Sequence, residues 1–494
     1  DPDGDHDDAV GSSGNGHADR RPRPLLPRYQ RPGDEVLPGP DPTPEYADIL
    51  AVVTGWQAIG LRRREIRRDD EQRANGVTFG VLGKASSRLF PVDLLPRVVT
   101  APEWTALSAG VEQRARALDA FLHDVYGERA AIADGIIPAW VVDGAPGLRS
   151  TGALMHQQRV RGHVCGMDLV RDGAGGWFVL EDNLRVPSGL GYALQNRRLS
   201  TAVLPDLPRP DGLLDTTRVA AMLRETLEHA ALPSAPDTVA PVLLSEGPEG
   251  SAWFEHRMLG EEAGIPVALT GDLLVADGRV YLVRDGGRSR VDVLYLRIDE
   301  DALLHATGAD GRPLGPQLLS VVAAGNVALV NAPGNGVGDD KAVYAFVPQL
   351  VEYYLGERPL LDIVPTFLCG IPEQLADVLA RLDHLVLKPV DGYGGQGVMI
   401  GPYATEAEIA TTRRQVRAAP HRWIAQEVVD LSTHPCFDGQ RLVPRHVDLR
   451  VFALHGAGVR AVPAALTRVA PTGSMIVNSS RGGGSKDTWL LAEA

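Results

Sequence analysis

Apolar residues recur at steps of three and four between Trp104 and Tyr126, a spacing that predicts an amphipathic helix packed against a core. The recurring positions are Leu107, Val111, Ala115, Leu118, Leu122 and Val125. Two strand-like segments follow, GHVCGMDLVRD and GWFVLEDN, and a glycine-rich turn at 173–176 joins them. This pattern predicts an antiparallel hairpin.

The rest of the chain alternates between strand and helix periodicity. A helix is expected over roughly 216–231, and residues 239–300 are predicted to form strands around a helix at 251–263. The next section is predicted to be rich in helices and includes LLSVVAAGNVALVN. Strands are then expected at LVLKPV, RWIAQEVV, VDLRVFAL, VRAVPAALTRVA and SMIVNSS. The alternation favours a mixed α/β (α+β) fold.

Four sections are expected along the chain. Residues 1–43 are rich in Asp, Gly, Pro and Arg and lack apolar periodicity, so they are predicted to be a flexible tail. Residues 44–200 are expected to hold a helical region and the hairpin. Residues 201–335 are predicted to form an α/β domain, and residues 336–494 a second mixed lobe.

Composition narrows the class of protein. A net charge of −14 over 494 residues disfavours a nucleic-acid binder, which needs a basic face. The three cysteines, Cys165, Cys369 and Cys436, are too scattered for a disulfide framework or a zinc site and suggest a reducing compartment. No apolar run approaches the roughly 20 residues of a membrane span, and the acidic N-terminus does not resemble a secretory signal. We therefore expect a cytoplasmic protein without a membrane or nucleic-acid partner.

A lysine followed by a glycine loop is the strongest chemical signal. In LVLKPVDGYGGQG, Lys388 ends a strand and Gly392, Gly394, Gly395 and Gly397 follow it. Glycines let backbone N–H groups approach phosphate oxygens closely, and the lysine adds a point charge. The order of these residues differs from a P-loop and from a dinucleotide fingerprint. Taken alone, a flexible hairpin with an incidental lysine explains the pattern equally well.

Motifs on both sides of the loop change this balance. Asp340-Lys341 precedes it at the start of a helix, and WIAQEVV, HVDLRVF, Arg468 and NSSRGGG follow it. In this order they resemble the ATP-grasp superfamily, which includes D-alanine–D-alanine ligase and glutathione synthetase. Members of that superfamily normally end with a Gly-x-Asp strand and a Glu-x-Asn strand that hold magnesium.

No such strand pair follows TWLLAEA in this sequence. The pattern is found near the N-terminus instead, as Gly166-Met167-Asp168 and Glu181-Asp182-Asn183. Glu181 and Asn183 are two positions apart on a strand, so they share a face, and carboxylate and amide oxygens are ligands that magnesium accepts. The chain is thus identified as a member of the circularly permuted ATP-grasp family, with an additional α/β pre-ATP-grasp-like domain. The resemblance extends to FPVDLLPRVVTAPEW…ALDAFLHDVYGE, taken as a helical stretch, and to LEDNLRVPSGLGYALQNR and SAWFEH.

The resemblance implies a role for each matching residue. Lys341 and Lys388 would contact the ATP phosphates, Gln426 and Glu427 would form the adenine hinge, and Asp448 would lie at the nucleotide site. Asp168, Glu181 and Asn183 would hold one or two Mg²⁺ ions. Arg450, Arg185 and Arg468 are the expected catalytic residues, at the transferred phosphate or beside it. Asn478 is expected to help bind the nucleotide. Weaker candidates for the acceptor site are His446, Glu255 and His256. Arg481 and Lys486 are further site candidates, because Gly482 to Gly484 would bring the backbone close to a ligand.

The resemblance implies an ATP- and Mg²⁺-dependent carboxylate–amine ligase that forms an acyl phosphate and releases ADP and phosphate. Its substrates would be a small-molecule or peptide carboxylate and an amine, whose identities the sequence leaves open. A kinase acting on a small molecule and a nucleotide-binding scaffold are the alternatives, although the full set of cations disfavours a scaffold. Oligomeric state is also open, with a homo-oligomer among the expectations.

Overall fold

A computed structural model describes residues 25–26, 29, 31–80, 87–391, 397–475, 477 and 483–493. Its α-helices are α1 (Ala47–Asn75), α2 (Ala101–Val125), α3 (Ala130–Ala133), α4 (Ala139–Asp143), α5 (Leu190–Val203), α6 (Val219–His229), α7 (Trp253–Ala263), α8 (Glu300–His305), α9 (Leu314–Ala323), α10 (Lys341–Tyr344), α11 (Val347–Leu355), α12 (Pro372–Ala380) and α13 (Glu406–Ala418). None of the helices in this part of the chain combines the length and hydropathy that a membrane crossing requires.

The centre of the molecule is an eight-stranded sheet of order β13-β5-β4-β19-β20-β21-β3, with β18 paired to β19. These strands are β13 (Asp362–Ile363), β5 (Trp177–Asn183), β4 (Val164–Arg171), β19 (Leu442–His455), β20 (Val459–Val469), β21 (Gly484–Leu490), β3 (Val92–Val99) and β18 (Thr433–Phe437). The predicted hairpin is confirmed, because β4 and β5 pair antiparallel. β4 also pairs with β19, so segments almost 300 positions apart in the sequence are neighbours in the sheet.

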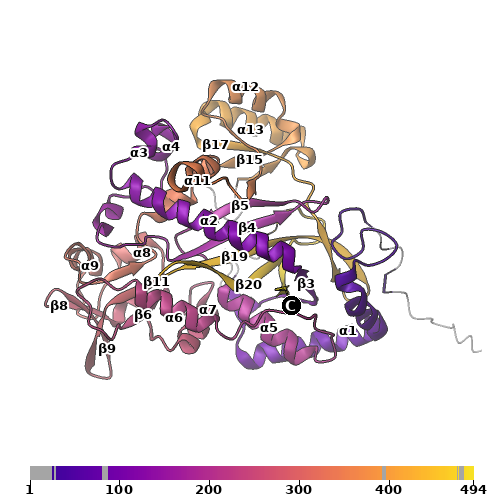
Figure 1. Cartoon of the computed structure of the whole chain (residues 1–494), viewed down its shortest axis with the longest axis horizontal. Coiled ribbons are helices and arrows are strands. Elements are labelled where there is room, and N and C mark those ends of the chain that lie inside the picture. The colour runs from indigo at the N-terminus through magenta and orange to yellow at the C-terminus, as the bar shows by residue number, and fades with distance from the viewer. Residues whose placement is uncertain are drawn as a thin grey trace, which may run out of the picture.

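Helix α2 covers one face of this sheet and crosses its strands, as Figure 1 shows. Cys165, Met167 and Leu169 of β4 pack against it, together with Leu449 and Val451 of β19. Because side chains alternate along a strand, the residues between these positions point to the opposite face. The opposite face therefore carries the polar residues Asp168, Asp448 and Arg450.

Helix α5 and a smaller sheet lie over different parts of the opposite face. α5 contacts β20 and β21 at one end. The smaller sheet, of order β14-β17-β15-β16, consists of β14 (Thr366–Leu368), β17 (Trp423–Glu427), β15 (Leu385–Pro389) and β16 (Met399–Ile400). Its outer face packs against α12 and α13, at the top of Figure 1. Its inner face is turned toward the large sheet, and a cavity lies between the two.

The middle of the chain forms a separate α/β layer. Its parallel sheet has the order β12-β11-β6-β7, with strands β12 (Ala328–Val330), β11 (Val293–Arg297), β6 (Pro241–Ser245) and β7 (Val267–Ala268). An antiparallel sheet of β10 (Gly287–Val291), β9 (Arg279–Arg284) and β8 (Leu273–Ala276) adjoins it, and β1 (Thr78–Gly80) pairs with β2 (Ser87–Leu89). The predicted alternation of strands and helices over 239–300 is confirmed.

Three secondary-structure predictions were wrong. FPVDLLPRVV is a strand, β3, that pairs in parallel with β21, and the helix begins after Thr100, whose capping box with Glu103 fixes its start. The second half of LLSVVAAGNVALVN is β12, because Gly325 ends the helix with a φ of 72° and the apolar run then pairs with β11. SMIVNSS was expected to be a strand, but residues 474, 475 and 477 lie outside strands and its other residues lie outside the described ones.

The prediction of a flexible tail over 1–43 is wrong for residues 31–43. Asp34 and Glu35 are buried, and Asp34 forms an isolated β-bridge with Thr433. Asp34 also accepts hydrogen bonds from the backbone N–H groups of Val36 and Leu37. A segment of low hydrophobicity can still pack against the rest of the protein when its carboxylates form buried hydrogen bonds and ion pairs. The sequence pattern alone did not indicate these contacts.

A buried ion pair holds α2 to β5, directly behind the cavity. The guanidinium of Arg114 donates two hydrogen bonds of 2.7 Å to the carboxylate of Asp182, and both side chains are almost fully buried. Asp182 lies between Glu181 and Asn183, so this pair anchors the strand from which those two side chains project.

Replacing Arg114 with Ala is expected to lower the free energy of unfolding by about 3–5 kcal/mol, because it leaves the Asp182 carboxylate buried without its partner. Arg116→Ala on the same helix is the matched control, since Arg116 pairs with Glu357 at the surface. That substitution is expected to cost less than about 1 kcal/mol. Urea unfolding of both variants measures the difference, and equal effects would contradict the anchoring role of the buried pair.

Candidate active site

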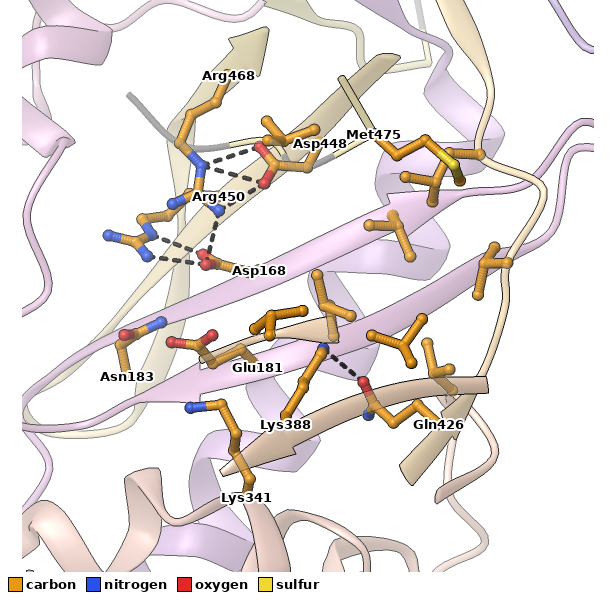
Figure 2. A pocket seen from close by; sticks show the side chains of 18 of the residues that line it. Asp168, Glu181, Asn183, Lys341, Lys388, Gln426, Asp448, Arg450, Arg468 and Met475 are labelled. Carbon is orange, nitrogen blue, oxygen red and sulfur yellow. Dashed lines mark hydrogen bonds and ion pairs between the residues drawn. The ribbon is translucent and has the colours of Figure 1, made fainter. Parts of the chain in front are cut away.

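A cavity of about 370 Å³ lies between the large sheet and the small one. Figure 2 shows charged side chains entering it from both sheets and from the start of α10. The described charged and amide residues that line it are Asp168, Glu181, Asn183, Lys341, Lys388, Gln426, Glu427, Asp448, Arg450 and Arg468. Most of the predicted site residues therefore converge here, although the sequence separates Asp168 from Arg450 by nearly 300 positions.

Sheet register explains this convergence. Glu181 on β5 stands directly opposite Asp168 on β4, and Asp168 stands opposite Arg450 on β19. The next residue on the same face, toward the start of β19, is Asp448, which stands opposite Arg468 on β20. Residues opposite one another in adjacent strands point to the same face, so two neighbouring rows of the sheet present the carboxylates and the arginines together.

Two arginines and two aspartates form a buried ion-pair network. Arg450 donates from Nε and Nη2 to the Asp168 carboxylate over 2.6 and 2.8 Å. Arg468 donates from Nη2 to Asp168 over 2.7 Å and from Nε to Asp448 over 2.9 Å. Burial alone would raise the pKa of Asp168, but the charges of Arg450 and Arg468 outweigh it and lower that pKa to about 2.

The influences on the pKa of Asp448 differ from those on Asp168, although both residues belong to the same network. Burial raises the pKa of Asp448, while Arg468 beside it acts in the opposite direction. Asp168 adds a second negative charge nearby, which also raises the pKa of Asp448. The paired carboxylates hold both arginine side chains, only 13% exposed, in fixed positions at the cavity.

The small sheet contributes Lys388 from β15. Its Nζ donates to the side-chain oxygen of Gln426 on β17 over 2.5 Å. Burial lowers the pKa of Lys388 to about 8, although the nearby carboxylate of Glu181 acts in the opposite direction. An anion bound beside Lys388 would favour its charged form.

Lys341 enters the cavity from the first residue of α10, as the Asp-Lys motif predicted. Asp340 caps this short helix, because its carboxylate accepts hydrogen bonds from the N–H groups of Ala342 and Val343. Lys341 also contributes to the lowered pKa of Lys388, as expected for two positive charges close together. The two lysines face the arginine network across the same cavity (Figure 2).

Glu181 and Asn183 fit a divalent cation. The amide nitrogen of Asn183 is buried and has no hydrogen-bond partner, and an amide can turn its oxygen to the same point. Glu181 adds a carboxylate on the same face of β5. Among the described residues no group of three or more His, Cys, Asp or Glu side chains is arranged for a metal. Magnesium suits this limited set, because it is commonly held by one or two carboxylates together with substrate phosphates and water.

The space between the sheets beyond Lys388 is apolar. Val386 and Lys388 alternate with core residues along β15, and Val386 pairs with Ile400 on one side and Gln426 on the other. Val364, Val398 and Val428 complete this part of the lining. Gln426 and Glu427, the predicted adenine hinge, line the same cavity.

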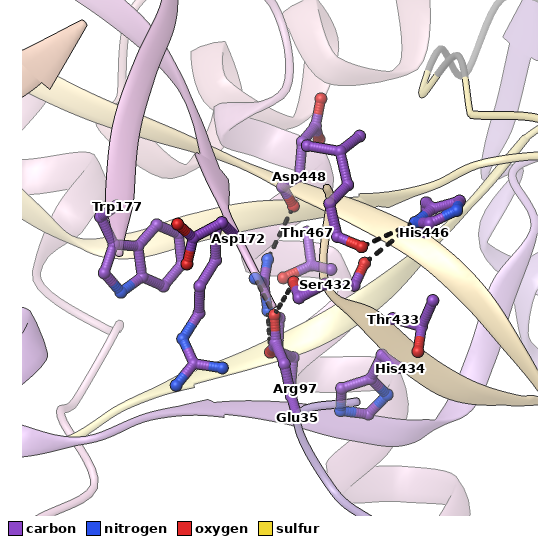
Figure 3. Close-up of polar contacts among 12 residues, drawn as sticks. Glu35, Arg97, Asp172, Trp177, Ser432, Thr433, His434, His446, Asp448 and Thr467 are labelled. Carbon is purple, nitrogen blue, oxygen red and sulfur yellow. Dashed lines mark hydrogen bonds and ion pairs between the residues drawn. The ribbon is translucent and has the colours of Figure 1, made fainter. Parts of the chain in front are cut away.

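A second buried ion pair supports Asp448 from behind, as Figure 3 shows. Arg97 on β3 is fully buried and donates from Nη1 to the backbone oxygen of Asp448 over 2.9 Å. Glu35 from the docked N-terminal segment accepts two hydrogen bonds of 2.8 and 2.6 Å from Arg97. Ser432 donates to the same carboxylate over 2.6 Å. The N-terminal segment 31–43 thus supplies, through Glu35, the negative charge that balances Arg97 behind the arginine network.

Several predicted residues lie elsewhere. Arg185 is half-exposed and pairs with Asp339 over 2.8 Å, outside the cavity lining. Lys486 is buried on another face, where its Nζ donates to Asp93 and to the backbone oxygen of Pro435. His446 contacts the backbone oxygens of Leu431 and Ser432 and is not among the lining residues.

Glu255 and His256 are buried beside the site rather than in it. The Glu255 carboxylate accepts hydrogen bonds from the N–H groups of Gly189 and Gly191 and from Arg297. His256 contacts the hydroxyl of Ser245 over 2.7 Å. Glu255 thereby holds the loop before α5, whose Ser188 and Gly189 do line the cavity.

Four predicted residues, Gly392, Gly394, Gly395 and Asn478, lie outside the described residues, as does Arg481. Gly397 is described and has a φ of 70°, a backbone conformation that favours glycine. Sequence reasoning missed Glu35, Arg97 and Phe79. The pattern offered no signal for them, because their contacts join segments that are far apart in the chain.

A family of known proteins shares this arrangement. The family described as circularly permuted ATP-grasp type 2 matches residues 96–470. The chain belongs to this family. The predicted fold is thereby confirmed: the hairpin that carries Glu181 and Asn183 precedes the nucleotide lobe in the sequence but lies beside it in the sheet.

Relatives of this ATP-grasp protein have been named in several bacteria. A Frankia alni protein with the provisional name glutamate–cysteine ligase 2-3 is 55% identical over 94% of this chain, and a Frankia casuarinae protein of the same provisional class is 52% identical over 94%. The chain spans 54% of the length of each of these two proteins. An uncharacterised Synechocystis protein is 42% identical over 93% of the chain and 96% of its own length.

A solved structure has a similar fold. It is a glutathione synthetase-like effector from Globodera pallida in its apo form, with a TM-score of 0.57 over 87% of this chain and 96% of the other. The two sequences are 11% identical, so the likeness concerns the fold alone.

Glu35→Gln is expected to lower the free energy of unfolding by about 3 kcal/mol, because it removes the counter-charge of the fully buried Arg97. Glu45→Gln, at an exposed position just after this segment, is the control and is expected to change stability by less than about 0.5 kcal/mol. Chemical denaturation measures both. A Glu35→Gln variant as stable as the control would show that residues 31–43 do not support the site.

Proposed function

We propose that this protein is an ATP- and Mg²⁺-dependent carboxylate–amine ligase that forms an amide bond through an acyl phosphate. The observation that supports the proposal most is the meeting of Lys341 and Lys388 with Arg450 and Arg468 in one cavity, with Glu181 and Asn183 between them. The family and the provisional ligase names of the Frankia proteins agree with this assignment.

Different parts of the cavity would bind different parts of a nucleotide. The apolar region around Val386 and Ile400 would hold the adenine, and Lys388 and Lys341 would neutralise the phosphates. Mg²⁺, held by Glu181 and Asn183 together with the phosphates, would supply further neutralisation of phosphate charge. Asp168 already accepts hydrogen bonds from two arginines, so we assign it chiefly to holding Arg450 and Arg468, and it would join the metal site only by sharing its oxygens.

Arg450 and Arg468 would orient the carboxylate substrate and stabilise the charge that develops during transfer. In the first step the carboxylate oxygen bonds to the γ-phosphorus, and the bond between that phosphorus and the oxygen bridging to the β-phosphate breaks, releasing ADP. In the second step an amine nitrogen attacks the carbonyl carbon, the carbon–oxygen bond to phosphate breaks, and the amine loses a proton. The products are the amide, ADP and phosphate.

The test of this proposal is an ADP-release screen with pairs of amino acids or short peptides, followed by mass spectrometry of the products. A ligase requires a carboxylate and an amine together and yields an amide. Phosphate left on a single acceptor would identify a kinase, and Mg-ATP binding without acceptor-dependent turnover would identify a scaffold. Either outcome would overturn the proposal.

Lys388→Ala is expected to raise the Kd for ATP about 10- to 100-fold, because a hydrogen bond to a charged group contributes about 1.5–3 kcal/mol. Calorimetric titration of ATP into the variant and the wild type measures this change. Lys388→Arg keeps the charge and is expected to recover part of the affinity. Unchanged affinity in Lys388→Ala would remove the lysine from the nucleotide site.

Glu181→Gln is expected to reduce Mg²⁺-dependent ADP release by at least about 100-fold, because it exchanges a carboxylate ligand for a neutral amide. Glu357→Gln, at a surface ion pair, serves as the control and should retain wild-type turnover. The readout is the rate of ADP release over a range of Mg²⁺ concentrations. Wild-type turnover in Glu181→Gln would rule out this strand as the metal site.

A further inference from the structure

The cavity has a second apolar region, on the side of the arginine network away from the small sheet. Phe79, Phe90, Tyr192 and Leu466 line it, together with Ser188 and Gly189. None of these residues belongs to the nucleotide elements on the small sheet. The proposed function leaves this region unused, and its composition bears on what the protein accepts as a substrate.

Contacts connect this region directly to the arginines. Leu466 on β20 stands opposite Arg450 on β19, so the two side chains are neighbours on the cavity face. Arg450 also donates from Nη1 to the backbone oxygen of Ser188 over 3.0 Å. Ser188 and Gly189 lead into α5, whose first turn carries Tyr192. A ligand group held by the arginines would therefore extend toward Tyr192.

The aromatic side chains form a rigid wall. The rings of Phe90 and Tyr192 are stacked with their centroids 4.4 Å apart, and both side chains are almost fully buried. Phe79 is half-buried and meets both rings edge-on, with its centroid 5.7 Å from each. Tyr192 uses its hydroxyl to donate to the backbone oxygen of Thr78 over 2.7 Å, so its polar atom is already occupied. The wall therefore offers carbon surface to a ligand, chiefly through Phe79.

The loop at the base of this wall is fixed by a buried carboxylate. Glu255 accepts hydrogen bonds from the N–H groups of Gly189 and Gly191 over 2.7 and 3.1 Å. Arg297 pairs with Glu255 and donates to the backbone oxygen of Pro187 and the hydroxyl of Ser188. These N–H groups are thus unavailable to a ligand, which leaves the wall apolar. A polar side chain placed against the rings of Phe79, Phe90 and Tyr192 would lose its water and gain no hydrogen bond from their carbon surface.

Within the part of the chain that the structure describes, one donor of the arginine network has no acceptor. Arg468 uses Nε and Nη2 for Asp448 and Asp168, and no described residue accepts a hydrogen bond from its Nη1. A carboxylate of the substrate bound in this part of the cavity would find this donor beside it. The same molecule would then place its side chain toward Phe79.

We propose that this region is the substrate subsite, and that it takes a carboxylic acid with an apolar or aromatic side chain, such as a hydrophobic amino acid or the corresponding peptide terminus. The inference rests on the proposed function for the role of the arginines. It differs from what the names of the Frankia proteins mention, because glutamate carries a charged side chain and cysteine a small one. An apolar side chain of the size of leucine or phenylalanine buries the carbon surface of Phe79, which a second carboxylate would not.

The experiment measures binding rather than turnover. Leucine, phenylalanine and glutamate, each free and N-acetylated, are titrated calorimetrically into the full chain in the presence of Mg-ADP. The phenylalanine or leucine form is expected to bind at least about tenfold more tightly than the matching glutamate form, since burial of a large apolar side chain contributes about 1.5–3 kcal/mol. Equal or tighter binding of glutamate, or no binding of any of the six compounds, would overturn the inference.

Phe79→Ala is expected to weaken binding of the apolar acid about tenfold while leaving the affinity for ADP unchanged, and Phe79→Leu should restore most of the loss. Tyr403→Ala, at a strongly exposed aromatic residue, is the control and should change neither affinity. Thermal unfolding of each variant verifies folding. If Phe79→Ala bound the apolar acid like the wild type, the subsite would lie elsewhere. Binding of apolar acids without any amide product would instead contradict the proposed function alone.

Discussion

The geometry of this site depends on a buried network of four charged side chains, Asp168, Asp448, Arg450 and Arg468. Asp168 pairs with both Arg450 and Arg468, Asp448 pairs with Arg468, and both carboxylates have almost no contact with water. A single unpaired charge at this depth would cost several kcal/mol, so each side chain requires the others. The network is possible only because the sheet register places its members opposite one another on β4, β19 and β20.

The supports behind this network come from remote parts of the chain. Arg97 on β3 holds the backbone of Asp448, and Glu35 from the N-terminal segment compensates the charge of Arg97. Arg114 on α2 holds Asp182 and thereby fixes the strand that presents Glu181 and Asn183. In each case an ion pair between a buried carboxylate and an arginine connects two segments of the chain. A charged side chain that faces the cavity lies next to each of these ion pairs. Rigid placement of this kind is what transfer of a phosphoryl group requires, since the reaction depends mainly on alignment and charge neutralisation.

The cavity also explains how one site could bind two dissimilar molecules. Its lining is apolar on the side of the small sheet, charged in the middle and apolar again near α5. A nucleotide and an apolar acid would each bury their carbon surface at opposite ends and bring their anionic groups to the centre. The loop before α5 has a fixed position at the second apolar region, because Glu255 and Arg297 hold it through buried hydrogen bonds.

The sequence by itself determined the local elements and the identity of most of the charged residues at the site. Periodicity found α2 and the β4–β5 hairpin, and the order of the motifs predicted the permuted ATP-grasp fold, because short-range patterns and motif order are written along the chain. It misassigned β3, whose apolar run becomes a strand only by pairing with β21, and it left the docking of Glu35 unnoticed. Only the tertiary structure decided that Arg468 joins Asp168, that Arg185 turns to Asp339, and that Phe79 reaches the cavity. The physical reason is that strand register and buried ion pairs are interactions between distant segments, and their energy depends on a geometry that no local pattern specifies.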